Sequence, residues 1–126
     1  MLVKMLRRFE PYAYAFLRIV AGLLFLFHGL QKLGVLGGQL TMPAVSLIGL
    51  AAIIETVGGL LIMIGYATAP VAFICSGEMA YAYFTAHQPR GTWPIQNGGE
   101  PAALFAFIFL YISTRGGGKF SIGGGK

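Results

Sequence analysis

The sequence predicts an all-α membrane protein, in which four transmembrane helices form an up-down bundle. Two observations lead to this fold class. Hydrophobic residues make up 56% of the 126 residues and charged residues only 10%, whereas about 25% of the residues of a typical soluble domain are charged. The apolar residues also gather in four long runs that are separated by short loops. The length corresponds to a single domain, which would cover residues 1–126.

The four expected spans cover about residues 11–31, 43–65, 70–87 and 101–114. A helix of about 20 residues crosses the roughly 30 Å of hydrocarbon in a bilayer. The fourth run is shorter, so we expect it to begin in the preceding loop or to lie where the bilayer is thin. Hydrocarbon leaves backbone groups no outside partner, and the runs lack the alternation of a β-barrel, so helices are required. Residues 115–126 are expected to form a flexible, glycine-rich tail.

The positive charges beside the spans predict that both termini lie in the cytoplasm, because Lys and Arg concentrate on that side of a membrane. Lys32 and Arg90 flank the opposite ends of the spans, whereas six other basic residues flank the ends near the termini. The net charge of +5 is thus a topology signal, and nucleic acid is excluded as a partner because the basic residues form no patch. The first run is longer than the core of a secretion signal, so we expect it to be a retained span.

Three charged residues lie inside the predicted spans: Arg18, Glu55 and Glu78. Each costs roughly 2.5–3.5 kcal/mol at the centre of a membrane helix, so each should face the bundle interior and find a partner. The simplest packing places Arg18 near Glu55 or Glu78, and we expect Arg18 and Glu55 to form a structural ion pair. Two carboxylates against one arginine leave one acid less well paired, which makes Glu78 a candidate proton carrier. A purely structural role is the alternative.

Further polar side chains lie at the ends of the spans that are predicted to face outward. His28 and His87 are candidates for a proton relay at this outer mouth, for haem or metal ligation, or for plain contact with the backbone. Asn97-Gly98-Gly99-Glu100 opens the last span, where it is either a helix start or a carboxylate facing the histidines. Cys75, the single cysteine, is expected to be inert packing, and it excludes an internal disulfide.

In this order the motifs of the chain resemble those of the DoxX family of small four-helix membrane proteins. The likeness covers about residues 10–122 and is carried by Arg18-x3-Gly22, His28-Gly29-x2-Lys32, Glu55-x2-Gly58-Gly59, Gly65, Glu78-Met79, His87-x-Pro89, Asn97-Gly98-Gly99-Glu100 and the glycine run before Ser121. Members often end in Ser-x-Asp, but here Gly123 follows Ser121-Ile122, so a role for a tail aspartate does not carry over.

The resemblance implies a multi-pass protein of the bacterial inner membrane without an assigned reaction. Relatives include a small subunit of an archaeal thiosulfate:quinone oxidoreductase, and others are linked to hydroquinone resistance or to thiol and oxidative stress. We therefore expect a component of quinone- or thiol-linked redox chemistry, with quinone as the ligand and a redox partner subunit or a second copy as the partner. The alternatives are a small-molecule or proton transporter and a structural subunit of a membrane complex.

The expected site lies near the outer leaflet and combines proton-exchanging groups with groups that hold a ring. Catalytic roles are expected for Glu78, His87 and Glu100. His28, His87 or Glu100 would exchange protons with the quinone oxygens, and Tyr81 or Trp93 would pack on the ring. No flavin or nicotinamide fingerprint is visible, so electrons would come from the partner. Ligand-binding roles are expected for five further residues: His28, Lys32, Tyr81, Trp93 and Asn97.

Overall fold

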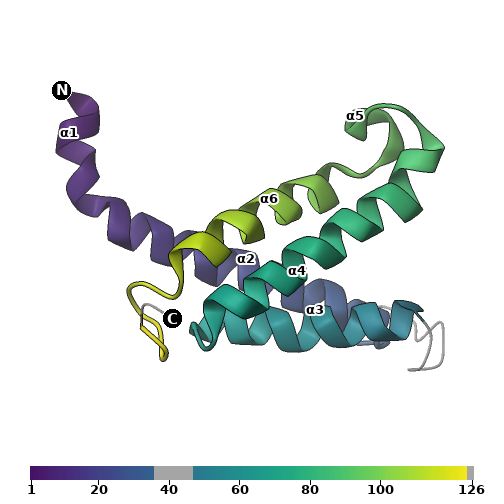
Figure 1. Ribbon diagram of the computed structural model, residues 1–126, viewed down its shortest axis with the longest axis horizontal. Helices are drawn as coiled ribbons and strands as arrows, with labels where there is room; N and C mark the ends of the chain where they lie inside the picture. The colour runs from purple at the N-terminus through teal and green to yellow at the C-terminus, as the bar shows by residue number, and fades with distance from the viewer. Residues whose placement is uncertain (36–46, 125–126) are drawn as a thin grey trace.

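The computed structural model describes residues 1–35 and 47–124, and all regular elements in these ranges are helical (Figure 1). The predicted all-α class is therefore confirmed. The elements are α1 (Leu2–Leu6), the 3-10 helix η1 (Arg7–Phe9), α2 (Glu10–Lys32), α3 (Leu47–Ile64), α4 (Thr68–Ala82), the π-helix η2 (Tyr83–His87), the 3-10 helix η3 (Gln88–Arg90), α5 (Pro94–Asn97) and α6 (Glu100–Arg115). The expected start of the second span, at residue 43, lies outside the described residues.

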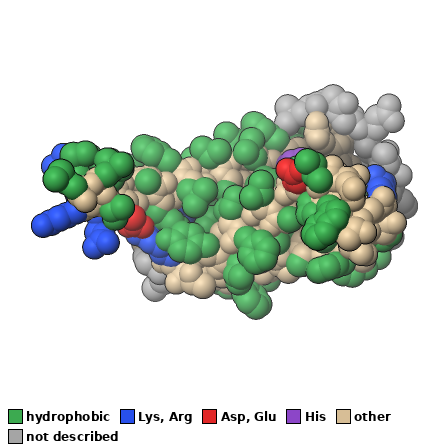
Figure 2. Space-filling model, turned by 90° about the horizontal axis from the view of Figure 1, so that it is seen from above, with side chains coloured by type: hydrophobic (Ala, Val, Ile, Leu, Met, Phe, Trp, Pro, Cys, Tyr) green, Lys and Arg blue, Asp and Glu red, His purple; other side chains and the backbone are tan. Residues whose placement is uncertain are grey.

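Two helices among the described residues are long and apolar enough to cross a membrane, which supports the membrane class. They are Leu2–Lys32, with a mean hydropathy of 1.8, and Leu47–Ile64, with a mean hydropathy of 2.3. The first is longer than expected, because α1 and η1 continue α2 toward the N-terminus. Hydrophobic side chains are spread along the whole face shown in Figure 2, and Lys and Arg gather mainly at the end that carries α1. Such a surface suits contact with lipid.

The long helices form two antiparallel pairs, α2 with α3 and α4 with α6 (Figure 1). The backbones of α2 and α3 touch at Gly22 and Gly59. A Cβ atom on Gly22 would lie 2.8 Å from the Gly59 carbonyl oxygen, and one on Gly59 would lie 2.7 Å from that of Gly22. Larger residues would push the helices apart, which is why small residues mark close helix contacts in membranes. This contact sets the register of the two helices.

The two pairs meet at the end of the bundle near the C-terminus and diverge toward α5 (Figure 1). The meeting point is built on Arg18, which is completely buried. Its Nη1 donates to the carbonyl oxygens of Ile62 at 2.9 Å and Met63 at 3.0 Å, in the last turn of α3. Its Nη2 donates to those of Lys119 and Phe120, each at 2.9 Å. One side chain therefore ties α2 to α3 and to the chain that follows α6.

The predicted ion pair between Arg18 and Glu55 is wrong, and the helix register explains the error. Arg18 lies one turn before Gly22 and is thus opposite Met63, one turn after Gly59, in the antiparallel helix. Glu55 lies one turn on the other side of Gly59. The partner of Arg18 is instead the carboxyl end of α3, whose last carbonyls lack donors within the helix and carry the negative end of its dipole.

The segment after α6 differs from the flexible tail that the glycines suggest, because it is bonded to the bundle. The backbone N–H of Ile122 donates to the carbonyl of Ile64 at 3.1 Å, and that of Gly123 donates to Gly65 at 2.9 Å. Gly65 has a φ of +77°, and a Cβ atom there would collide with Ser121. A glycine is therefore needed at position 65 for this segment to close the end of the bundle.

We predict that Arg18→Leu lowers the free energy of unfolding by at least about 1.5–3 kcal/mol, since four carbonyls lose a charged donor. Arg18→Lys should recover only part of this loss, because an ammonium cannot reproduce the fork geometry of a guanidinium. Thermal unfolding in mild detergent measures both variants. Arg90→Leu, at an exposed position, is the control and should change stability by less than about 0.5 kcal/mol. Equal stability of Arg18→Leu and the control would show that this contact does not hold the bundle closed.

Candidate functional site

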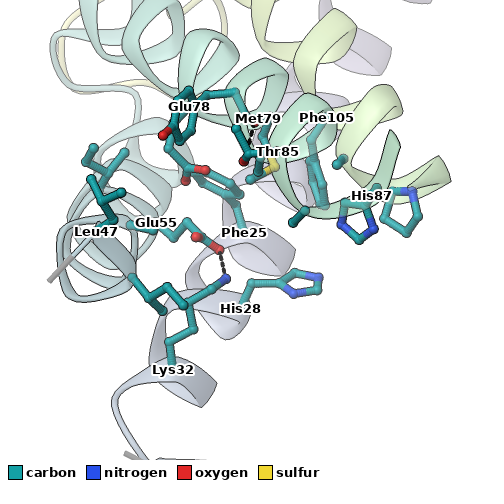
Figure 3. A pocket seen from close by; sticks show the side chains of 18 of the residues that line it. Phe25, His28, Lys32, Leu47, Glu55, Glu78, Met79, Thr85, His87 and Phe105 are labelled. Atoms are coloured by element: carbon teal, nitrogen blue, oxygen red, sulfur yellow. Dashed lines mark hydrogen bonds and ion pairs between the residues drawn. The ribbon is translucent and has the colours of Figure 1, made fainter. Parts of the chain in front are cut away.

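A cavity of about 630 Å³ opens where the two helix pairs diverge (Figure 3). Side chains from α2, α3, α4, η2 and α6 line it, and most of them are apolar. Its size falls in the range of small-molecule sites, which are concave and apolar with a few polar groups. In Figure 3, Glu55, Glu78 and Lys32 lie on one side of the view, and His28 and His87 lie on the other. Phe25 and Phe105 lie between the carboxyl groups and His87, whereas His28 lies next to Lys32.

The first polar side contains an ion pair between Lys32 at the end of α2 and Glu55 of α3. Lys32 Nζ lies 2.7 Å from Glu55 Oε1. Glu55 is 1% exposed, so its charge is removed from solvent and needs this partner. The side chain of Lys32 points from α2 to Glu55 of α3 and stays partly exposed (Figure 3). Lys32 thus takes the place that the sequence analysis assigns to Arg18.

Glu78 of α4 joins the same group from the other helix pair. Its carboxyl group lines the same cavity as that of Glu55 (Figure 3). Glu55 Oε2 and Glu78 Oε1 are both buried, and neither accepts a hydrogen bond from a donor among the described groups. Two carboxyl groups and one ammonium group therefore lie on this side of a mostly apolar lining.

The second polar side contains His28 of α2 and His87 at the end of η2. The ring of His28 meets that of Phe105 edge-on, with 5.9 Å between the ring centroids. His87 Nδ1 lies 3.3 Å from the carbonyl oxygen of Asn97, a contact that favours a proton on Nδ1 and leaves Nε2 as an acceptor. The π-helical turn in which His87 lies is a feature often found at functional sites. Both histidines line the same cavity.

Three expected site residues do not line the cavity. Glu100 begins α6 and is exposed, and Trp93 is 63% exposed in the loop before α5. Asn97 is buried, but its side chain is used within the loop: Nδ2 donates to the Gly91 carbonyl at 3.1 Å, and Oδ1 accepts from the Gly99 N–H at 2.8 Å. Asn97 therefore shapes the loop from within. The expected convergence of Glu100 with the two histidines is not found.

Sequence reasoning missed two parts of this site. Phe25 and Phe105, which separate the two polar sides, read as ordinary core residues because aromatic side chains at helical spacing occur in any apolar helix. The pairing of Lys32 with Glu55 was missed as well. A signal for it exists: if Gly22 and Gly59 are matched in an antiparallel pair, the end of α2 lies near Glu55.

The lining can bind a small apolar body, orient it with aromatic rings, and exchange protons at two places. Histidine and carboxyl groups are the usual side chains for proton transfer near neutral pH. Among the described residues, no group of three or more His, Cys, Asp or Glu side chains is placed to hold a metal ion. Cys75 is buried beside this region, and a buried thiol in apolar surroundings behaves as a small hydrophobic side chain.

We predict that Lys32→Met lowers the free energy of unfolding by about 3–5 kcal/mol, because it leaves the buried Glu55 carboxylate unpaired. Glu55→Gln removes that charge, so the double variant should be more stable than Lys32→Met alone. Thermal unfolding of the three variants tests the coupling. The exposed pair of Arg115 and Glu10, also at 2.7 Å, is the matched control and should be worth less than about 1 kcal/mol. Additive effects at Lys32 and Glu55 would contradict the ion pair.

Comparison with known proteins agrees with the motifs of the sequence. The DoxX family model matches residues 13–88, which is more than half of the chain. A protein of Haemophilus influenzae that is described as uncharacterized is 41% identical over 125 residues, covering 93% of this chain and 92% of the relative. No solved structure matches the chain. The match to the family model includes the helices that carry Arg18, Lys32, Glu55 and Glu78, and the chain belongs to the DoxX family.

Proposed function

We propose that this protein binds a lipophilic molecule of the quinone class in the cavity and serves quinone-linked redox chemistry in the bacterial inner membrane. The observation that carries the proposal is the cavity itself, which has polar groups on two sides and aromatic rings between them. A quinone has a flat apolar ring with an oxygen at each of two opposite positions. A site that offers polar groups on both sides of an apolar space suits that shape.

In this proposal the side chains on each polar side of the cavity bind one oxygen of the quinone ring. Lys32 has three N–H donors, of which one is used by Glu55, so it can donate to a carbonyl oxygen of the ring. His28 and His87 serve the other oxygen, and Phe105 and Tyr81 pack on the ring. Reduction of a quinone to a quinol takes two electrons and two protons. The side chains supply the path for protons, and a redox partner subunit supplies the electrons.

The proposal includes four membrane spans with both termini in the cytoplasm. Two observations support this arrangement. The helix formed by α4, η2 and η3 covers residues 68–90, and α6 runs antiparallel to it, so each helix of this pair can cross the membrane beside α2 and α3. The end of the bundle with both termini also carries most of the positive charge. The cavity then faces the outer leaflet, where a molecule dissolved in lipid can enter.

Proton-coupled binding or transport is the second candidate function. The observation that favours it is the carboxyl pair of Glu55 and Glu78 in an apolar lining, since intramembrane acids commonly mark proton relays in transporters. Uptake of protons by liposomes without any quinone chemistry would distinguish it from the redox function.

The topology can be tested with labels at the two ends of the bundle. We predict that a reporter fused after residue 126 is active on the cytoplasmic side, because the basic flanks hold that end inside. A cysteine introduced at Thr92, in the exposed loop before α5, should react with a membrane-impermeant reagent from outside. The native Cys75 is buried and serves as the internal control. Labelling of the C-terminal end from outside would reverse the orientation.

Ligand binding can be tested on purified protein in mild detergent. We predict that a short-chain ubiquinone analogue binds, and that Ala86→Phe weakens its affinity at least tenfold, about 1.4 kcal/mol, because the new ring fills space at an exposed position of the lining. Ala13→Phe, an exposed position outside the lining, is the control. His87→Ala should weaken binding, whereas Glu100→Gln should not. Equal affinities in Ala86→Phe and Ala13→Phe would place any quinone elsewhere.

A further inference from the structure

We propose that the Glu55–Glu78 pair holds one proton, and that a small organic cation entering the cavity replaces it. The cavity would then exchange a proton for a cation. This inference goes beyond quinone binding and rests on the proposed function only in one respect, namely that the cavity admits a small molecule. It arises from the charges that face the cavity, from two unpartnered oxygens, and from the nature of the remaining lining.

The charges near the pair do not balance without a further positive group. Glu55 and Glu78 would together carry two negative charges, and Lys32 carries one positive charge. The other titratable groups that face the pair or its cavity are His28 of α2, Cys75 and Tyr81 of α4, and His87 of η2. None of these is a permanent cation, and the part of α6 that lines the cavity has no titratable side chain.

The contacts of the two carboxyl groups indicate where the further positive charge, a proton, is held. Glu55 Oε1 accepts from Lys32, but Glu55 Oε2 and Glu78 Oε1 are buried without a donor. Two ionised carboxylates are both acceptors and repel one another, whereas a carboxyl group that bears a proton donates to its neighbour. One proton on the pair supplies the donor that these two buried oxygens lack. With that proton, Lys32, Glu55 and Glu78 sum to zero charge.

Because the buried group must stay neutral, the carboxyl pair binds either a proton or a second cation, but not both. An unpaired charge in apolar surroundings is costly, so the ionised pair is stable only when a second cation takes the place of the proton. An ammonium group suits this role, because its N–H donors form charge-assisted hydrogen bonds with carboxylates. Binding of the cation then releases one proton, and removal of the cation takes it back.

The rest of the lining favours an organic cation. A cavity of about 630 Å³ is far larger than a dehydrated metal ion, and its walls are mostly apolar. Phe25 and Phe105 present aromatic rings, which pack on hydrocarbon groups and attract cations. A primary amine with an aromatic body meets all three requirements: a positive head for the carboxyl pair, donors for its oxygens, and a body for the apolar walls.

The test uses two probes of similar shape, 4-phenylbutylamine and 4-phenylbutan-1-ol, with the full-length protein in mild detergent. We expect the amine to bind at least tenfold more tightly than the alcohol. Calorimetry in two buffers with different ionisation enthalpies should show about one proton released per amine bound, and the amine affinity should rise about tenfold per pH unit while the pair holds its proton. The infrared band of a protonated carboxylic acid should disappear when the amine binds. These measurements need no variant.

Glu78→Gln provides the matching variant, because its amide can donate to Glu55 as the protonated acid does but cannot ionise. We expect retained thermal stability, unchanged affinity for the alcohol, a loss of amine affinity of more than about tenfold, and no proton release. Glu100→Gln removes a carboxylate outside the cavity and should behave as the native protein. Persistence of the pH dependence in Glu78→Gln would assign the exchange to a histidine and overturn the proposal.

The remaining outcomes separate this inference from the proposed function. Equal affinity for the amine and the alcohol without proton release would reject the exchange, and so would competition by sodium or potassium as strong as that by the amine. If the exchange is rejected by either result but the ubiquinone analogue binds, the proposed function is still supported. Amine binding with proton release, but no quinone binding, would support the exchange and reject the quinone. Failure of all probes would reject both.

Discussion

The bundle depends on the buried guanidinium of Arg18, which holds one end of the molecule closed. Its four hydrogen bonds join the last turn of α3 to the chain after α6. An arginine is suited to this role, because its planar fork carries five donors and keeps its charge in any surroundings. The negative end of the α3 dipole compensates the positive charge without a carboxylate. Both acidic residues of the spans are therefore available for another purpose.

The way in which the bundle is closed at Arg18 explains why it is open at the other end, near α5. The α2–α3 pair is held tightly by the contact at Gly22 and Gly59, and α4 packs along α6. Because the two pairs are joined where Arg18 lies, they separate toward α5, and the separation leaves the cavity between Lys32, Glu55 and Glu78 on one side and the histidines on the other. The π-helical turn that ends in His87 brings that side chain to the cavity at the point where α4 leaves the bundle.

The two functional proposals use different parts of the same lining. A quinone needs donors for two oxygens, which Lys32 and the histidines offer. A cation needs acceptors and a negative charge, which Glu55 and Glu78 offer once they lose their proton. Both rest on one physical fact: polar side chains in apolar surroundings interact more strongly with a bound molecule than they would in water. A carboxyl pair in such a place is costly to keep for stability alone.

The sequence by itself determined the helical class, the membrane character and the DoxX motifs, because these follow from the length and composition of local apolar runs and from short residue patterns. It also indicated that Arg18, Glu55 and Glu78 face the bundle interior, since a membrane helix forces its charges inward; Arg18 and Glu55 are buried and Glu78 is half-buried. Only the tertiary structure decided their partners. Backbone carbonyls are present at every residue, so no sequence pattern marks the ones that bind Arg18. The pairing of Lys32 with Glu55 depends on the register that Gly22 and Gly59 set between α2 and α3. The exclusion of Glu100 from the cavity and the bonding of the tail depend on contacts between segments that are distant in the chain, which no local pattern contains.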